Sequence, residues 1–173
     1  MKDLETERLR LRHLRKEDAQ RIFDYWASDP EVTKYLTWPT HASVAVTEAV
    51  VDLWLAEYDN PDCCRYGIEL KETGELIGMI DVVKIVDGIP EIGYCSGRPA
   101  WGHGYMTEAL KAVCAALFEE GYPAIFIRAI RENVGSNRVI QKAGFSFIDS
   151  VEGPLSENNP KIVTVNRYRL DRE

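Results

Sequence analysis

Three strand-like runs follow one another between residues 64 and 96, and the turns between them constrain the fold more than any other feature. The runs are CRYGIEL, LIGMIDVVKI and IPEIGYCS, and the connections KETGE and VDG separate them. Glycine in such short connections is typical of hairpins. The sequence therefore predicts an antiparallel meander in the middle of the chain.

Helical and strand patterns surround this meander on both sides. RLRLRHL alternates leucine with arginine and predicts a half-buried strand that keeps Arg8, Arg10 and Arg12 on its exposed face. Apolar spacing predicts helices near residues 16–26, 28–36, 43–58, 106–120 and 133–143. Further strands are expected at AIFIRAI, FSFIDSV and IVTVNRYRL. The apolar side of the helix over 43–58 is expected to carry Val46, Val50, Leu53, Trp54 and Glu57.

No repeat, linker or low-complexity segment interrupts this order, so we expect one α+β domain over residues 1–173 with about seven strands. Hydrophobic residues make up 45% of the 173 residues and charged residues 28%, which is the balance of a globular protein with a sizeable core. The formal net charge of −7 opposes direct binding to nucleic acid and suits a cationic partner.

Neither a membrane span nor a metal site is expected. No apolar run approaches the roughly 20 residues that cross a bilayer, and the charged start MKDLETERLRLR is unlike a signal peptide, which predicts a cytoplasmic protein. The four cysteines lack CxxC spacing and are interpreted as reduced thiols: Cys63, Cys64, Cys95 and Cys114. The three histidines lack neighbouring ligands at metal-binding spacing: His13, His41 and His103.

The stretch SGRPAWGHGYMTEALKAV places two glycines around His103, just before an amphipathic helix. Helix N-termini carry unpaired N–H groups and partial positive charge, so such a junction is able to hold a phosphate. The alternative is an ordinary loop that needs glycine for a positive φ. A dinucleotide fingerprint fails because Thr107 stands where its third glycine belongs, and the Gly-Lys-Ser/Thr of a P-loop is absent from the sequence.

Four stretches carry a more specific pattern: LETERLRLRHL, EIGYCSGRPAWGHGYMTEAL, NVGSNRVIQKAGF and VNRYRL. Together they closely resemble the GNAT acetyl-CoA-dependent N-acetyltransferases, in particular the RimJ/RimL subgroup of ribosomal-protein N-terminal acetyltransferases. The resemblance covers nearly the whole chain. It implies a GNAT fold, with a mostly antiparallel mixed sheet flanked by helices and with splayed fourth and fifth strands between which the cofactor's pantetheine arm lies.

The resemblance also implies how acetyl-CoA is bound. Backbone amides would surround the pyrophosphate at Gly102, His103, Gly104, Tyr105, Met106 and Thr107. Asn133 matches the asparagine that bonds the pantetheine arm, and Arg138 and Lys142 are placed to meet phosphate or adenosine. The strand near Cys95 and Ser96 would present amides to the cofactor's carbonyls. The sequence departs from the family pattern at Pro99, preceded by Arg98, where glutamine or arginine is usual.

The chemistry requires a base, an oxyanion site and a proton for the leaving thiolate. Glu91 is the first candidate for the base, directly or through water, and the alternative is an exposed charge at the strand end. The Cys95 backbone amide would hold the oxyanion. Ile140 replaces the tyrosine that donates the proton in many relatives, which leaves Ser136 as candidate acid or as a small residue early in a helix. Tyr168 is a weaker candidate acid.

Two further interpretations concern the acceptor side. A covalent route through the Cys95 thiol is disfavoured because no base or cationic partner stands at local spacing. Trp38, in the polar loop TWPTH, is expected at the mouth of the acceptor site.

The sequence thus predicts direct transfer of acetyl from acetyl-CoA to a primary amine, in the first place the α-amine of a protein or peptide. A small-molecule amine, such as a polyamine or aminoglycoside, is the alternative acceptor, and a CoA-binding module without turnover is the alternative class. GNAT relatives are often monomers or homodimers, and either state is expected for this chain.

Overall fold

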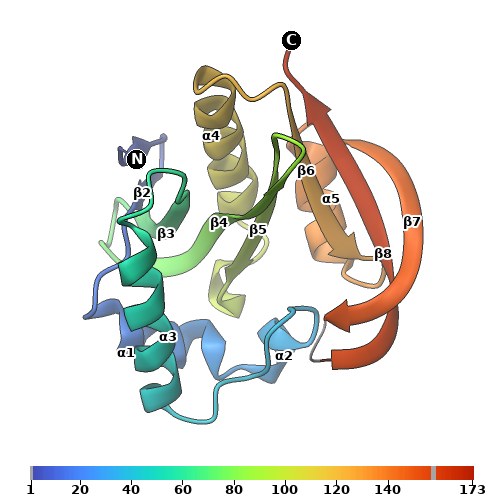
Figure 1. The fold of residues 1–173 in the computed structure, drawn as a ribbon. Coiled ribbons are helices and arrows are strands. Elements are labelled where there is room, and N and C mark those ends of the chain that lie inside the picture. Colours follow the sequence, from blue (N-terminus) through green and yellow to red (C-terminus); the bar gives the residue numbers. More distant parts are fainter. Residues whose placement is uncertain (1, 157–158) are drawn as a thin grey trace. The chain divides into compact units, whose positions relative to one another are not determined.

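The computed structural model of the protein describes residues 2–156 and 159–173, and these residues form one mixed sheet of eight strands (Figure 1). The strand order is β1-β2-β3-β4-β5-β6-β8-β7. The strands are β1 Leu4–Glu5, β2 Leu9–Arg12, β3 Arg65–Leu70, β4 Leu76–Val86, β5 Ile89–Ser96, β6 Ala124–Ile130, β7 Ser146–Ser156 and β8 Asn159–Asp171. The seven expected strands are present, and the eighth is the short β1, which pairs antiparallel with β2.

The helices follow the expected order with different bounds. They are α1 Asp18–Ile22, α2 Pro30–Thr33, α3 Val44–Glu57, α4 Tyr105–Glu119 and α5 Val134–Lys142. After α1 the chain widens into a π-helical turn, η1 Phe23–Ala27, and a 3-10 turn, η2 Arg98–Ala100, follows β5. Asp29 caps α2, because its side chain accepts a hydrogen bond from the Glu31 N–H at 2.9 Å. Among the described residues, no helix is both long and apolar enough to cross a membrane.

The chain divides into two compact units, each made of two segments. The first unit comprises Met1–Asp81 and Tyr94–Tyr105, and the second comprises Val82–Gly93 and Met106–Glu173. The expectation of a single domain over residues 1–173 stays a prediction.

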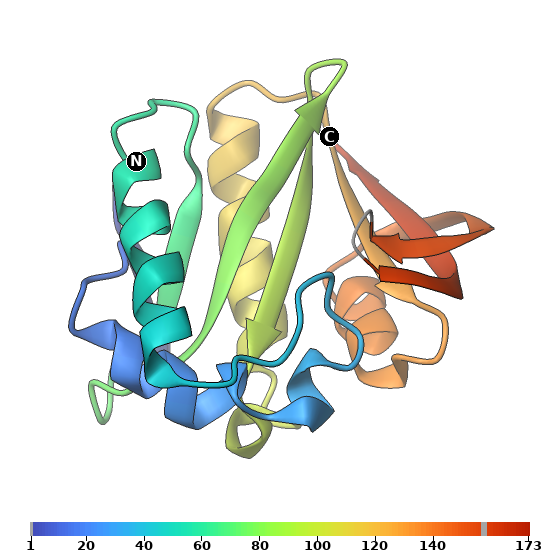
Figure 2. The same ribbon diagram turned by 60° about the horizontal axis from the view of Figure 1, so that its bottom comes forward.

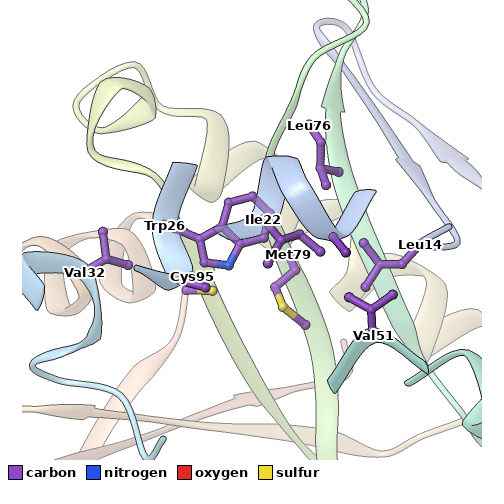
Figure 3. Close-up of a cluster of buried hydrophobic side chains, with 10 residues drawn as sticks. Leu14, Ile22, Trp26, Val32, Val51, Leu76, Met79 and Cys95 are labelled. Carbon is purple, nitrogen blue, oxygen red and sulfur yellow. The ribbon is translucent and has the colours of Figure 1, made fainter. Parts of the chain in front are cut away.

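In the first unit, α1 and η1 pack with α3 over a cluster of buried side chains. Figure 3 shows Trp26 in this cluster beside Ile22, with Cys95 and Met79 nearby. β2 and β3 contribute Leu9 opposite Leu70 and Leu11 opposite Ile68, and Leu9, Leu11 and Ile68 are buried. The core of this unit therefore joins residues from distant parts of its sequence.

The exposed position expected for Arg12 is wrong. Its side chain is only 6% exposed and lies between two carboxylates. Arg12 Nε donates to Glu69 at 2.6 Å, and its two terminal nitrogens donate to Asp18 at 2.8 and 2.9 Å. Burial is tolerated because these acids pair and hydrogen-bond the guanidinium, which raises the pKa of Arg12.

The side of α3 that was expected to be apolar is only partly correct, because Trp54 packs against the core cluster but other expected members are exposed. Thr47 and Val51 are the buried residues of this helix, whereas Val46 is exposed and Leu53 is 67% exposed. The Thr47 hydroxyl is compensated by a hydrogen bond of 2.7 Å with Nδ1 of the buried His41. The hydrogen bond with His41, in the loop before α3, thus allows the face of α3 with Thr47 to be buried.

In the second unit, β6, β8 and β7 form the antiparallel end of the sheet, with α5 next to β6 (Figure 2). The helix predicted after the glycine loop is amphipathic as expected, since Leu110, Val113 and Leu117 of α4 are buried. The expected turn between β4 and β5 is confirmed as well, with positive φ at Asp87 (52°) and Gly88 (75°).

β5 and β6 run parallel and pair only at Glu91 with Phe126 and Ile92 with Ile127. Pairing over two positions in strands of eight and seven residues is the splay expected for the fourth and fifth strands. The predicted fold class is therefore confirmed.

Candidate active site

The glycine loop before α4 has the backbone that the sequence predicts. Gly102 and Gly104 have φ angles of 78° and 81°, a region that side chains with a Cβ rarely adopt. A Cβ at Gly102 would meet no heavy atom within 4 Å, and one at Gly104 would meet only Arg8 Nη2 at 3.5 Å. Positive φ by itself explains the glycines, and the open side of Gly102 leaves room for a ligand. The loop therefore fits a phosphate held by backbone amides.

Arg8 contacts this loop, a role that no sequence pattern indicated. Its Nη1 donates to the His103 carbonyl at 2.9 Å, and its guanidinium carbon lies 4.6 Å from the centre of the Tyr105 ring. The rings of His103 and Tyr105 stack with centroids 5.4 Å apart. Arg8 thus fixes the loop's backbone across 95 positions of sequence, a link that local spacing does not reveal.

The thiol of Cys95 is part of the core of the first unit. It is 8% exposed, it belongs to the Trp26 cluster, and burial raises its pKa, with Asp81 adding in the same direction. A thiol of this kind is protonated at neutral pH, so it is a poor nucleophile. The covalent route through Cys95 is therefore unsupported, and only its backbone amide remains a candidate.

The chain around Ser96 is held by its neighbours. The Ser96 carbonyl accepts a hydrogen bond of 2.9 Å from the Trp101 indole, and the Gly97 N–H donates to the Ile77 carbonyl at 3.0 Å. A Cβ on Gly78 would lie 2.5 Å from the Cys95 carbonyl. Glycine at this position allows β4 and β5 to approach closely where Cys95 and Ser96 lie.

Trp38 is half-buried and packs against the same core cluster, with its ring 5.1 Å from that of His41. Its place at an acceptor mouth stays a prediction.

Arg98 forms an ion pair of 2.6 Å with Asp29. This pair gives Arg98 a role in anchoring η2 to the start of α2.

In the second unit, Glu91 lies between two cations. Its side chain is 12% exposed, Arg128 Nε donates to Oε1 at 2.6 Å, and Lys84 Nζ lies 3.4 Å from Oε2. The alternative interpretation of Glu91, a solvated charge at the strand end, is therefore wrong. Both of its carboxylate oxygens have a cationic partner, so a direct role as base requires that at least one of these contacts open.

Asn133 and Ser136 meet at the start of α5. The Asn133 side-chain oxygen accepts a hydrogen bond from the Ser136 N–H at 3.2 Å, so Asn133 caps the helix. The NH₂ of the same side-chain amide takes no part in this cap. Ile140 is fully buried on this helix, and Arg138 and Lys142 are exposed on it. Four positions expected to contact acetyl-CoA thus lie on α5 and its cap, whereas Met106 and Thr107 of the same unit lie at the start of α4.

Tyr168 is buried and its hydroxyl donates to the Asn137 side-chain oxygen at 2.6 Å. Asn137 in turn donates to the carbonyls of Ile130 and Asn133, and its side-chain oxygen also accepts from Asn166. No sequence pattern pointed to Asn137. This network ties α5 to β6 and β8 and gives the Tyr168 hydroxyl a structural partner. A role of Tyr168 as an acid stays a prediction.

In the described part of the chain, no group of three or more His, Cys, Asp or Glu side chains is arranged to hold a metal ion. All four cysteines are free thiols.

Residues 8–146 match the family model described as the acetyltransferase (GNAT) domain. The chain therefore belongs to the GNAT family of acetyltransferases, whose members transfer an acetyl group to an amine. It is 34% identical to the uncharacterized N-acetyltransferase p20 of Bacillus licheniformis, over 84% of this chain and 83% of that protein.

Solved structures share the fold over nearly the full chain. One is the acetyltransferase from Salmonella typhimurium that modifies the N-terminal serine of ribosomal protein L7/L12, with a TM-score of 0.85, 18% identity and coverage of 99% of this chain and 100% of that one. Another is RimL, the ribosomal L7/L12 alpha-N-protein acetyltransferase, in complex with coenzyme A, with a TM-score of 0.84, 18% identity and 98% coverage of both chains. At this identity the likeness demonstrates a common fold.

Proposed function

We propose that this chain transfers the acetyl group of acetyl-CoA to the α-amine of a protein or peptide by direct attack in a ternary complex, as in the RimJ/RimL subgroup. The observation that carries the proposal is the loop with positive φ at Gly102 and Gly104, open on one side and leading into α4. The named acceptor and the bound coenzyme A of the two similar structures support the choice of substrates. A cytoplasmic location and a monomeric or homodimeric state belong to the same proposal.

The residues proposed to bind acetyl-CoA contact different parts of the cofactor. The amides of residues 102–107 bind the pyrophosphate, with Arg8 holding the loop in place. The NH₂ group of Asn133 bonds the pantetheine arm while its oxygen caps α5. Arg138 and Lys142 meet the phosphates or adenosine, and the backbone of Cys95 and Ser96 meets the carbonyls next to the thioester. When bound, acetyl-CoA supplies the activated acetyl group.

The proposed proton path begins at the acceptor. An α-ammonium group has a pKa of about 8, so it must lose a proton before attack near neutral pH. Glu91 accepts that proton through a bound water, because both of its oxygens are held by Arg128 and Lys84. Glu91→Gln should therefore lower kcat/KM most at low pH, and an equal loss at all pH values would assign it a positioning role.

The second proton is needed by the departing thiolate. Ser136 is the proposed donor, because Ile140 offers no hydroxyl where a tyrosine donates in many relatives. Ser136→Ala should then lower kcat more than it changes the affinity for acetyl-CoA. An unchanged kcat, with chemistry limiting, would mean that the thiolate, with a pKa near ~8.5 by analogy with cysteine, takes its proton from solvent.

The buried Ile140 also favours a second candidate function, a CoA-binding module without turnover. Release of free CoA thiol from acetyl-CoA, measured with a panel of amines, distinguishes the two. The panel contains a peptide with a free N-terminus, the same peptide with a blocked N-terminus, a polyamine and an aminoglycoside. We expect saturable release with the free peptide alone. If CoA release saturates with the polyamine or aminoglycoside instead, the acceptor is a small-molecule amine and not a peptide. If no amine causes CoA release, the result favours the binding module.

A further inference from the structure

Two arginines of the second unit lie directly opposite each other on neighbouring strands. Arg128 of β6 is in register with Arg167 of β8, and the next pair on the same face is Phe126 with Arg169. Side chains at directly opposite positions in an antiparallel pair share a face, where like charges repel. The side chains of Arg128 and Arg167 are 45% and 47% exposed. This arrangement concentrates positive charge on an accessible part of the sheet.

The neighbouring carboxylates balance this charge only in part. Glu91 pairs with Arg128 and also with Lys84, whereas Asp149 pairs with Arg167. The hydrogen bond with Arg167 lowers the pKa of Asp149, so this acid is ionised at neutral pH. The two carboxylates of Glu91 and Asp149 thus pair with the three cations Lys84, Arg128 and Arg167, which leaves one positive charge in excess here. The net charge of the whole chain is −7.

The hydrogen bonds of the two arginines differ. Arg167 donates to Asp149 from both Nε and Nη2. Arg128 donates to Glu91 from Nε, and no hydrogen bond from its Nη1 or Nη2 joins it to another of the described residues. Paired N–H groups of a guanidinium match the two oxygens of a carboxylate. Arg128 therefore has donor capacity left for an anion.

An apolar strip continues from the arginines along the same face. Val165 lies two residues before Arg167 and is in register with Ile130 on β6 and with Val151 on β7. Because residues two apart in a strand share a face, these side chains adjoin Arg128 and Arg167. Val151 is exposed. A partner that combines apolar groups with a carboxylate, as a short peptide does, complements this surface.

We propose that Arg128 and Arg167 bind a carboxylate of the acceptor, so that the enzyme prefers peptides with an acidic side chain close to the N-terminus. The proposal rests on the proposed function, because it assigns a substrate class to the same reaction. The Nη groups of Arg128 bind the carboxylate, and Arg167, which is paired with Asp149, adds positive charge at the opposite position of the neighbouring strand. The contact of this carboxylate with Arg128, the partner of Glu91, brings the acidic peptide to the residue proposed to receive the amine's proton.

Two peptides test this preference, identical except that one has glutamate and the other glutamine at the second and third positions. Steady-state kinetics are measured for the native enzyme, Arg128→Gln, Arg167→Gln and the matched control Arg172→Gln. Arg172 is exposed, and its backbone N–H bonds the Pro123 carbonyl. We expect the native enzyme to prefer the glutamate peptide roughly tenfold, as suits charge-assisted bonds at half-exposed groups.

The preference should lie in KM, and each variant at Arg128 or Arg167 should lose most of it. Kinetics with the glutamine peptide should stay unchanged in Arg167→Gln, and Arg172→Gln should retain the full preference. Because Arg128 also holds Glu91, Arg128→Gln is judged by the ratio of kcat/KM for the two peptides and not by its activity with either one. Equal kcat/KM for the two peptides with the native enzyme would overturn the acidic-acceptor proposal and leave acetyl transfer intact. So would equal losses for both peptides in the arginine variants, because these would indicate a structural role.

Calorimetric binding of the same peptides to the protein with CoA tests the site without turnover. Tighter binding of the glutamate peptide, lost in Arg128→Gln, supports the site even if no acetyl is transferred, in which case only the proposed function fails. Equal affinities of the two peptides overturn the site. A third peptide with phosphoserine at the second position checks the anion, and much tighter binding of this peptide would reassign the site to phosphate and overturn the carboxylate assignment.

Discussion

Gly102→Ala separates the two reasons for a glycine in the loop before α4. Gly102 has a φ of 78° and open space where a Cβ would lie. Gly74, in the turn between β3 and β4, has a φ of 72° and the same open space. Alanine therefore introduces the same kind of backbone strain at both positions, and only Gly102 is proposed to face the cofactor.

The expected magnitudes follow from this geometry. A residue with a Cβ in the left-handed region costs roughly 1–2 kcal/mol, which for a chain of this size lowers Tm by about 2–4 °C for each kcal/mol. Both variants should show this loss of stability without ligand. At a concentration 100-fold above Kd, acetyl-CoA stabilises the folded state by about 2.7 kcal/mol. If the alanine methyl raises Kd tenfold, that stabilisation falls to about 1.4 kcal/mol.

Calorimetric titration with acetyl-CoA and thermal unfolding with and without it measure both quantities. We expect Gly74→Ala to bind acetyl-CoA as the native protein does and Gly102→Ala to bind it at least about tenfold more weakly. His103→Ala should retain most of the affinity, because the proposed contact is the backbone. Equal affinities of Gly102→Ala and Gly74→Ala would refute the assignment of these amides to the pyrophosphate.

Substitutions at three further positions test single features of the protein. Asn133→Asp keeps the oxygen that caps α5, so it should retain stability but lose affinity for acetyl-CoA. Asn133→Ala should lose this affinity and also about 1 kcal/mol of stability. Normal binding of acetyl-CoA by the aspartate variant would show that Asn133 serves only as a helix cap. Arg12→Met removes the cation between two largely buried carboxylates, leaving, among the described residues, Glu69 only the longer pair with Arg10 and Asp18 no ion-pair partner. It should lower the urea-derived free energy of unfolding by about 3 kcal/mol, so a loss near zero would contradict the ion-pair interpretation. Burial lowers the pKa of His41 below its ordinary 6.5, so below that pH the unfolded chain binds a proton that the folded chain does not. Stability should therefore fall as the pH drops through this range, and His41→Gln should reduce the slope; identical slopes would show that His41 titrates normally.

Features set by neighbours in sequence were predictable. The positive φ at Gly88, Gly102 and Gly104 follows from short glycine-containing connections, and the cap of α2 follows from Asp29 before Pro30. Such features depend on steric limits and hydrogen bonds within a few residues. They were sufficient to predict the strand order of the meander and the position of the candidate cofactor loop.

Features set by distant partners were not predictable from pattern. The alternating pattern places Arg12 on the exposed face of a strand. Its burial is possible because Glu69 on β3 and Asp18 on α1 pair with its guanidinium group. The contact of Arg8 with His103 and the hydrogen bond between Tyr168 and Asn137 likewise join remote segments. Periodicity reports which face is apolar on average and contains no information about a polar partner on another element.

Acetyl transfer from acetyl-CoA to an α-amine is tested most directly by locating the acetyl group in the product. Acetyl-CoA with an isotopically labelled acetyl group is incubated with a peptide that has a free N-terminus and one internal lysine, and the product is fragmented by mass spectrometry. We expect label on the N-terminal amine, one free CoA thiol for each acetyl group transferred, and no label on the same peptide with a blocked N-terminus. Label on the lysine, or CoA release without labelled peptide, would contradict transfer to the α-amine.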